Sequence, residues 1–348
     1  MDKKITIHDV AKQSGVSVST VSLVLNNKPG VSQETRERVF EVAETLDYQA
    51  KPASAPGKSS RLTTIGMIVK TDPDLPPQAN PFYSKVIVGI ENSCRRNGVN
   101  LLFATLPVDE NNRPVEVPQL MNNDTIDGLL MVGTFVDETI ASLSSKRRLP
   151  IVLVDGYSDT DSFDTVISDN FRAAYQAVEY LIGRGHRKIG LVGGDVKCYP
   201  SLKERRDGYF RALKENGIGE TFTANFNINK TDGEEVVSLL RAHPEITALF
   251  CLNDNVGSAS IKAVQDLGKR VPEDIAVVGY DDTYIATLTH PALTTMHVDT
   301  VAMGYGAVDL LSLRLDHPES ARMTLTVHAC LVERDSVCDA PAPSLSRR

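Results

Sequence analysis

The sequence predicts a small all-α head followed by an α/β body of two lobes, each built on a doubly wound parallel sheet. Within residues 6–26, apolar side chains recur at helical spacing on both sides of a short break. From residue 64 onward, short apolar runs alternate with helical stretches, which is typical of parallel sheets covered by helices on both faces. Two such cycles of similar size, separated near residues 167–170, indicate two lobes rather than one large sheet.

The head begins with two short predicted helices joined by a tight turn. Their apolar positions follow the i, i+3, i+4 rule, at Ile7, Val10, Ala11 and again at Val21, Val24, Leu25. Between them, Gly15 can adopt the positive φ of a turn, and Ser17 stands where an N-cap is expected. The pattern predicts a helix-turn-helix, whose second helix lies in the DNA major groove. The alternative is a helical corner of an ordinary domain.

A third helix and a linker complete the N-terminal part of the chain. Ser32 can cap a helix over residues 33–46, and residues 51–62 are rich in Pro, Ser and Ala, as linkers are. We therefore expect a helix-turn-helix domain at residues 1–50, a linker at 51–62, the body at 63–339 and a disordered tail at 340–348.

The body's strands are predicted from short apolar runs at residues 65–69, 101–106, 128–132, 151–154, 189–192, 248–252 and 276–278. Helices are expected between them at residues 83–97, 171–184, 206–216, 233–243 and 255–267. The serine-rich runs 142–145 and 158–162 are interpreted as loops, and Gly193-Gly194-Asp195 as a turn beside the cleft.

Composition and charge narrow the class of protein. Residues 1–62 hold nine Lys or Arg against seven Asp or Glu, whereas the whole chain carries a net charge of −8. A slightly basic head on an acidic body suggests that only the head approaches phosphate, weakly and with strong salt dependence. No apolar run approaches the ~18 residues of a membrane span, and residues 1–6 do not resemble a signal peptide. Five cysteines without CxxC spacing suit a reducing cytoplasm, so we expect a cytoplasmic protein without a metal site or cofactor.

Several motifs, in order, resemble the LacI/GalR family of transcription regulators. In the head they are residues 6–26, residues 31–38 and Tyr48. In the body they are residues 80–83, 127–129, 185–190, 253–254, 278–282, 293–295 and 303–304. No single body motif is specific, but the ordered set covers residues 5 to about 337.

The resemblance implies a homodimer, or a tetramer, that places two heads on a pseudo-palindromic operator in double-stranded DNA. It also implies a body of the type I periplasmic-binding-protein-like fold, with a small-molecule effector between the lobes. In such folds the chain passes between the lobes three times, expected here near Ser168, near residues 296–299 and near residues 325–327. Lobe 1 would then comprise about 63–168 and 297–325, and lobe 2 about 169–296 and 326–339.

The resemblance also implies which residues contact DNA. Val18, Ser19 and Leu23 occupy positions that face the bases. Positions that resemble phosphate contacts are occupied by Thr6, Ser17, Ser22, Asn26, Ser32 and Thr35. Short hydroxyls and amides can reach phosphate without a charge. Ser17 and Ser32 could equally be helix caps, or serve in both ways.

Two departures from the family pattern change what the head is expected to do. Relatives usually carry Arg at the position of Leu23, and Arg is the commonest donor to guanine, whereas Leu can only pack against apolar base edges. Relatives also form a hinge helix whose Leu wedges into the minor groove, but here Pro56 precedes Gly57 at that position. We expect a different operator core, and a linker that stays flexible and bends the DNA little. The alternative is a truncated hinge helix over residues 51–55.

The effector site is predicted from strand ends and from the resemblance. Ligands of open α/β sheets bind at the carboxyl ends of the strands. The nominated residues are Phe82 or Tyr83, Asp155, Arg205, Asn253 and Asp281. Carboxylates and amides bind hydroxyl pairs, Arg forks across two oxygens, and an aromatic ring covers a C–H face. The set suits a neutral carbohydrate, or a nucleoside, better than an anion.

Each nominated polar residue has a second interpretation. Asp281-Asp282 could cap the following turn, Asn253 could be an N-cap, and Arg205 could lie on a solvated charged face. At the level of the whole chain, the leading hypothesis is an effector-controlled repressor rather than an enzyme, because no nucleophile–base pair or metal spacing is visible. The alternative is a solute-binding protein of a transporter, for which the body alone would suffice.

Overall fold

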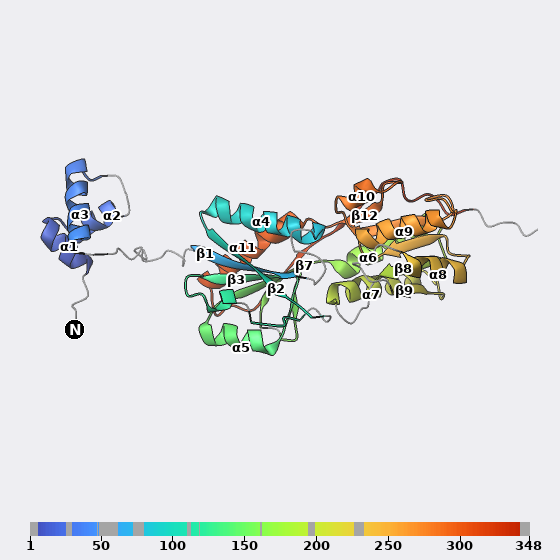
Figure 1. The fold of residues 1–348 in the computed structure, drawn as a ribbon, viewed down its shortest axis with the longest axis horizontal. Helices are drawn as coiled ribbons and strands as arrows, with labels where there is room; N and C mark the ends of the chain where they lie inside the picture. The colour runs from blue at the N-terminus through green and yellow to red at the C-terminus, as the bar shows by residue number, and fades with distance from the viewer. Residues whose placement is uncertain are drawn as a thin grey trace, which may run out of the picture. The chain divides into compact units, whose positions relative to one another are not determined.

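The computed structural model describes residues 6–25, 30–46, 48, 62–71, 80–109, 113–117, 119–160, 162–193, 199–225 and 233–341. The chain divides into two compact units, Met1–Arg61 and Leu62–Arg348. The first is the head and the second is the two-lobed body (Figure 1).

The head is a bundle of three helices, α1 (Ile7–Ser14), α2 (Val18–Leu25) and α3 (Gln33–Thr45). Val10, Val21 and Val39, one from each helix, are fully buried together in its small core. Gly15 ends α1 at φ 69°, the left-handed conformation that the turn requires. The helix-turn-helix geometry follows from this core and turn.

The first lobe of the body is a six-stranded sheet in the order β13-β7-β5-β3-β1-β2, with its strands pairing in parallel. These strands are β1 (Thr64–Thr71), β2 (Asn100–Pro107), β3 (Gly128–Val132), β5 (Ile151–Val154), β7 (Asp164–Ser168) and β13 (Thr324–Val327). Helices α4 (Pro81–Asn97) and α11 (Thr300–Asp316) cover one face, and α5 (Glu138–Arg147) covers the other (Figure 1). A short 3-10 turn (Gln119–Asn122) and the two-stranded pair β4 (Phe135–Val136) and β6 (Tyr157–Ser158) complete this lobe.

The second lobe repeats the architecture with a sheet in the order β14-β12-β11-β10-β8-β9. Its strands are β8 (Ile189–Gly193), β9 (Phe222–Asn225), β10 (Ala248–Cys251), β11 (Ala276–Asp281), β12 (Thr294–His297) and β14 (Cys330–Val332), the last antiparallel to β12. Helices α6 (Asn170–Gly183) and α7 (Pro200–Glu215) pack on one face. On the other face lie α8 (Glu234–Ala242) and α9 (Asp254–Asp266), and the short α10 (Ile285–Leu288) follows β11. Both lobes therefore have the predicted α/β fold with helices on both faces of a mostly parallel sheet.

The chain passes between the two sheets after β7, after β12 and after β13. The first two passages fall where the sequence places them, near Ser168 and residues 296–299. The third also falls at the predicted place, near residues 325–327, because β13 pairs with β7 as far as Val327 and the chain leaves the lobe directly afterwards. Thr326 and Val327 therefore belong to lobe 1, rather than to lobe 2 as the predicted boundary after residue 325 had it.

The two helices on one face of the first sheet cross at unusually close range. A Cβ on Gly304 of α11 would lie 2.6 Å from the backbone oxygen of Val86 in α4, and a Cβ on Gly89 would meet the backbone oxygen of Val301. Only glycine fits at this crossing. It ties residues from the N-terminal and C-terminal parts of lobe 1 into one core.

One predicted loop is wrong, since residues 142–145 lie inside α5. Asp137 accepts a hydrogen bond from the Ile140 backbone N–H at 3.1 Å and so caps the helix, while Ile140 is buried against the sheet. The predicted turn at Gly194-Asp195, the linker with Pro56-Gly57, and residues 342–348 of the tail lie outside the described residues. Among the helices of the described ranges, none has the length and hydropathy of a membrane span.

Candidate functional site

Helix α2 presents a largely uncharged surface at the positions that were predicted to face bases. Ser19 is exposed, Leu23 is 38% exposed, and Val18 is half-buried. Val21 and Val24, on the opposite side of the helix, are fully buried in the core of the head. The helix thus offers Ser19 and Leu23 outward while the valines fix it to the bundle.

Of the hydroxyl residues predicted to contact phosphate, all but Ser22 lie at the starts of helices. The Thr6 backbone N–H and hydroxyl donate to Asp9 at 2.8 and 2.7 Å, at the N-terminus of α1. Ser17 accepts from the Thr20 N–H at 3.1 Å, and Ser32 accepts from the Thr35 N–H at 3.4 Å. Ser17 and Ser32 are therefore helix caps, and phosphate contact would be a second role for them. Ser22 is half-buried on α2, and Asn26 lies outside the described residues.

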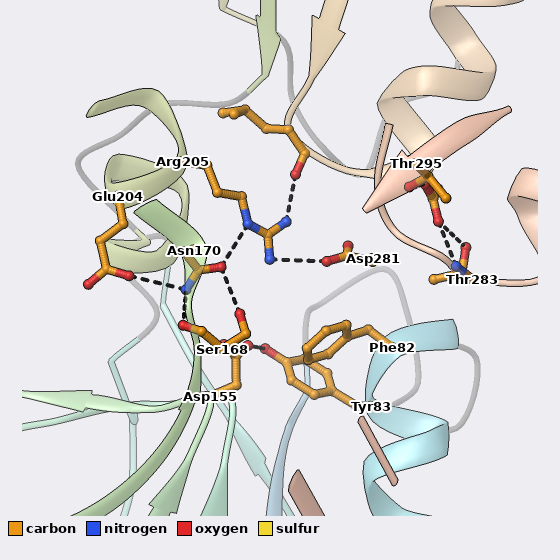
Figure 2. Close-up of polar contacts among 12 residues, drawn as sticks. Phe82, Tyr83, Asp155, Ser168, Asn170, Glu204, Arg205, Asp281, Thr283 and Thr295 are labelled. Atoms are coloured by element: carbon orange, nitrogen blue, oxygen red, sulfur yellow. Dashed lines mark hydrogen bonds and ion pairs between the residues drawn. The ribbon is translucent and has the colours of Figure 1, made fainter. Parts of the chain in front are cut away.

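A pocket in the body is lined by all six residues that the sequence nominated for the effector. Figure 2 shows five of them: Phe82, Tyr83, Asp155, Arg205 and Asp281. Phe82 and Tyr83 come from the first turn of α4, and Asp155 follows β5, all in the first lobe. Arg205 from α7, Asn253 at the start of α9, and Asp281 at the end of β11 come from the second lobe. Since both lobes supply the lining, the pocket lies between them.

Arg205 is the centre of the polar network in this pocket. It is 4% exposed, so the interpretation as a solvated charged residue is wrong. Its Nε donates to Asn170 Oδ1 at 2.9 Å, its Nη1 to the Leu252 carbonyl at 2.6 Å, and its Nη2 lies 3.0 Å from Asp281 Oδ1. The guanidinium also stacks over the Tyr280 ring, 3.7 Å from its centroid (cation–π). A guanidinium with five N–H groups held in this way keeps donors for a ligand.

Asp155 supplies an acceptor that the described protein groups leave unused. Its Oδ2 accepts from the Tyr83 hydroxyl at 3.0 Å, whereas its Oδ1 is buried without a hydrogen-bond partner among the described residues. Burial raises the pKa of Asp155 to about 6, an effect that Arg205 and the Tyr83 hydrogen bond partly oppose. A buried, unpaired carboxylate oxygen is costly, so a donor on a ligand would be favoured there.

The second lobe contributes acceptors held in fixed, partly strained backbone. Asn253 is the N-cap of α9, accepting from the Val256 N–H at 2.9 Å, so the capping interpretation holds while the residue also lines the pocket. Asp281 has φ 100°, an unfavourable value for a residue with a Cβ, and burial raises its pKa against the effect of Arg205. Asp282 instead contacts Arg334 and His297, at 2.5 and 2.9 Å. Among the described residues, neither aspartate side chain makes the contacts of a turn cap.

Several lining residues were missed by reasoning from the sequence. They are Lys70, Asn80, Pro81, Tyr199, Ser201, Leu202, Asp254, Asn255 and Thr283. Lys70 could have been found, because it follows the apolar run of β1 just as Asp155 follows that of β5. Asp254 binds its own lobe, accepting from the Thr283 N–H at 2.6 Å and from the Thr295 hydroxyl at 2.6 Å. Burial and the charge of Asp281 raise the pKa of Asp254 to about 7.

The chemistry of the pocket fits a small polar organic molecule. Carboxylates of Asp155 and Asp281 face the cations Arg205 and Lys70, with two aromatic rings from α4 beside them. Phe82 and Tyr83 meet edge to face, with ring centroids 5.4 Å apart. Across the described part of the chain, no group of three or more His, Cys, Asp or Glu side chains has the arrangement of a metal site.

Comparison with known proteins finds a matching family model for both the head and the body. A family model described as bacterial regulatory proteins, lacI family, matches residues 6–51, and a periplasmic binding protein-like domain matches residues 178–337. An HTH-type transcriptional repressor PurR of Aliivibrio salmonicida is 33% identical over 337 residues, covering 95% of this chain and 98% of that protein. The PurR of Erwinia tasmaniensis is 34% identical, covering 97% and 98%.

Solved structures agree with these relatives. The transcriptional regulator CelR in complex with cellobiose is 27% identical, with a TM-score of 0.69 over 96% of this chain and 100% of that one. The lac repressor dimer bound to operator is 23% identical, with a TM-score of 0.69 over 97% and 100%, and supports the fold alone. Because relatives more than 30% identical align along nearly the whole chain, this protein belongs to the LacI family of bacterial regulatory proteins.

Proposed function

We propose that the protein is an effector-controlled transcriptional repressor that binds a pseudo-palindromic operator as a homodimer and takes a carbohydrate into the pocket between its lobes. The observation that carries this proposal is the pocket itself, which draws Tyr83 and Asp155 from one lobe and Arg205 and Asp281 from the other. The same chain carries a helix-turn-helix head, so a ligand in the pocket can control DNA binding. The relatives are named as repressors, so no catalytic activity is proposed.

Two heads are needed because one head binds DNA weakly. The head has a surplus of only two positive charges, and α2 offers Ser19 and Leu23 rather than a guanidinium. The non-specific affinity for DNA rises with the number of phosphates that the protein neutralises. The sequence-specific affinity rises with the number of side chains that donate two hydrogen bonds to a base. A dimer doubles both terms on a two-fold symmetric site. Binding to operator DNA also implies that the protein acts in the cytoplasm.

A carbohydrate suits the donors and acceptors of the pocket. Its hydroxyl groups can donate to Asp155 Oδ1, which lacks a described partner, and can accept from Arg205. Its C–H face can pack on the aromatic rings of α4. The cellobiose bound by the related CelR supports this class of ligand. A nucleoside has hydroxyls and a ring as well and is the competing ligand.

The pocket provides a physical route from ligand to DNA. A ligand shifts a conformational equilibrium only if it binds one state better than the other. Because the lining residues come from both lobes, a bound ligand contacts all of them at only one angle between the lobes. That angle determines the spacing of the two heads in a dimer, and hence the fit to a fixed half-site spacing.

The test is a thermal-shift screen of the full chain against sugars and nucleosides, followed by operator footprinting with each ligand that binds. We expect one or more sugars to raise Tm and to change the protection of a palindromic site. If nucleosides alone raise Tm, the effector is a nucleoside rather than a carbohydrate. A protein that protects no palindromic site under any ligand would contradict the proposed regulator.

A further inference from the structure

Lys70 makes a contact between the two lobes inside the effector pocket. It lies near the carboxyl end of β1 in the first lobe and is 4% exposed. Its Nζ donates to the hydroxyl of Tyr199 at 2.9 Å, and Tyr199 precedes α7 in the second lobe. Both residues line the pocket. A side-chain bridge between the lobes therefore forms part of the pocket lining.

The surroundings of the Lys70 ammonium hold it in place. It lies 4.4 Å from the centroid of the Tyr199 ring and 5.7 Å from that of Tyr83, so aromatic faces from both lobes stabilise the charge. The charge also interacts with the buried carboxylate of Asp155. A buried ammonium is costly unless it is paired and hydrogen-bonded, and these contacts provide both.

The space left among the lining side chains is small. It encloses about 80 Å³. One water-sized group needs roughly 10–15 Å³ by this kind of measure, so there is room for roughly five to eight such groups. A hexose has twelve non-hydrogen atoms, so one sugar ring with its hydroxyls already needs the lobes to adjust around it, and two linked rings exceed the space far more. A second ring would have to extend beyond this space, and the hydrogen bond between Lys70 and Tyr199 holds part of the pocket lining together across the lobes.

We propose that the bridge between Lys70 and Tyr199 is a length gate that restricts the effector to a single ring and excludes its disaccharide. This inference rests on the proposed function, because it assumes a carbohydrate between the lobes. It adds a specificity-determining residue, Lys70, to the effector site. A shorter, uncharged side chain at this position would remove both the bond and the bulk that limit the ligand.

The experiment is isothermal titration of the full chain with matched pairs: glucose and cellobiose, xylose and xylobiose, galactose and lactose. The variants are Lys70→Ala, Lys70→Met, which keeps the length without the charge, and Tyr199→Phe, which removes only the hydroxyl. Lys262→Ala is the control, since Lys262 is an exposed lysine on α9. We expect the wild type to prefer the monosaccharide of one pair. Lys70→Ala should shift the ratio of dissociation constants toward the disaccharide about tenfold or more, with Lys70→Met and Tyr199→Phe intermediate.

The results that overturn the gate differ from those that overturn the effector class. A wild type that binds a disaccharide as tightly as its monosaccharide, or a ratio unchanged in Lys70→Ala, refutes the gate while the carbohydrate site stands. If Lys70→Ala binds neither sugar, an unchanged ratio in Tyr199→Phe refutes it. Binding of nucleosides alone, or of no member of the panel, refutes the carbohydrate proposal and the gate together.

Discussion

The hydroxyl of Tyr83 donates a 3.0 Å hydrogen bond to Oδ2 of Asp155 and leaves Oδ1 of the same carboxylate buried without a partner among the described residues. Asp155 is also strained, with φ 46°. A side chain that is strained, desolvated and half-satisfied is poorly suited to stabilising the fold. Its properties suit ligand binding, and the first prediction follows from them.

Asp155→Asn should raise Tm by a few degrees, corresponding to about 1 kcal/mol, and weaken effector binding at least about tenfold. The amide still accepts from Tyr83, but the buried charge is gone, and with it the strongest acceptor for a ligand hydroxyl. Thermal melts and titration calorimetry measure the two effects. Asp159→Asn, on an exposed pair with Arg113, is the control and should change neither. Unchanged stability together with unchanged affinity would contradict this role.

Effector affinity should increase as the pH rises through about 6, because the Asp155 carboxylate is a stronger acceptor for ligand hydroxyls when ionised and its pKa is about 6. The stability of the unliganded protein should change in the opposite direction. Since the folded pKa lies above the ordinary 3.8, this group stabilises the fold below about pH 4 and loses that contribution as the pH rises through about 6. Titrations between pH 5 and pH 7.5 test this prediction. Asp254 titrates near the same range, so the effect of Asp155 is the part that disappears in Asp155→Asn.

Arg205→Met should destabilise the protein by about 3–5 kcal/mol, because it leaves the Asp281 carboxylate buried without its cation. Asp281→Asn should cost less, and the double variant should recover about 1–3 kcal/mol relative to the sum of the two. Denaturant unfolding followed by circular dichroism gives the three values. The exposed pair Arg113–Asp159 provides a reference cycle with coupling below about 1 kcal/mol. Additive single-variant costs at Arg205 and Asp281 would show that the two charges act independently.

Leu23→Arg should change the preferred operator sequence toward guanine at the contacted position. Leu23 is exposed on α2, and an arginine there could donate to guanine O6 and N7. Selection from random DNA with wild type and variant measures the change. Phe40→Arg, at an exposed position on α3, adds the same charge and should raise affinity without altering the sequence preference. Identical preferred sequences for wild type and Leu23→Arg would refute base contact at this position.

The operator should be bent little, because Pro56-Gly57 occupies the position where relatives carry a wedging leucine. A gel phasing assay measures the bend, and Gly57→Leu should increase it together with operator affinity. Asp339→Leu, near the other end of the chain, is a control for the added apolar side chain. A large bend in the wild type would show that another part of the protein deforms the DNA.

The sequence predicted the elements that bury continuous apolar runs and missed those stabilised in other ways. Strand β3 has five buried residues and was predicted, whereas β13 is mostly exposed and β12 contains the buried polar residues Thr294 and Thr295. Thr295 is buried because its hydroxyl donates to Asp254, a contact between residues 41 positions apart that no local pattern contains.

The same limit applied to the site. Asp155 and Asp281 were predicted because they follow the ends of strands. Whether Arg205 faces solvent could not be predicted in this way, because it depends on where α7 begins, at Pro200. The same rule for strand ends could have found Lys70, but its contact with Tyr199, 129 positions away in the other lobe, has no local signal. For side chains with such distant partners, the sequence can suggest that they belong to the site, but it cannot predict which residues they contact.

The return of the chain to its first lobe also affects the order in which the lobes fold during synthesis. Ile90 of α4 packs in one core with Met303 and Val308 of α11, and β7 pairs with β13, yet β8 to β12 are synthesised between these partners. On the ribosome, the second lobe therefore completes most of its sheet while the first, though begun earlier, still lacks a helix and an edge strand. The part of the sheet that α11 covers, on β3, β5 and β7, stays exposed during that interval, when nascent chains are most prone to aggregate. The lobe that is translated first therefore waits for residues 300–327 before its core can close.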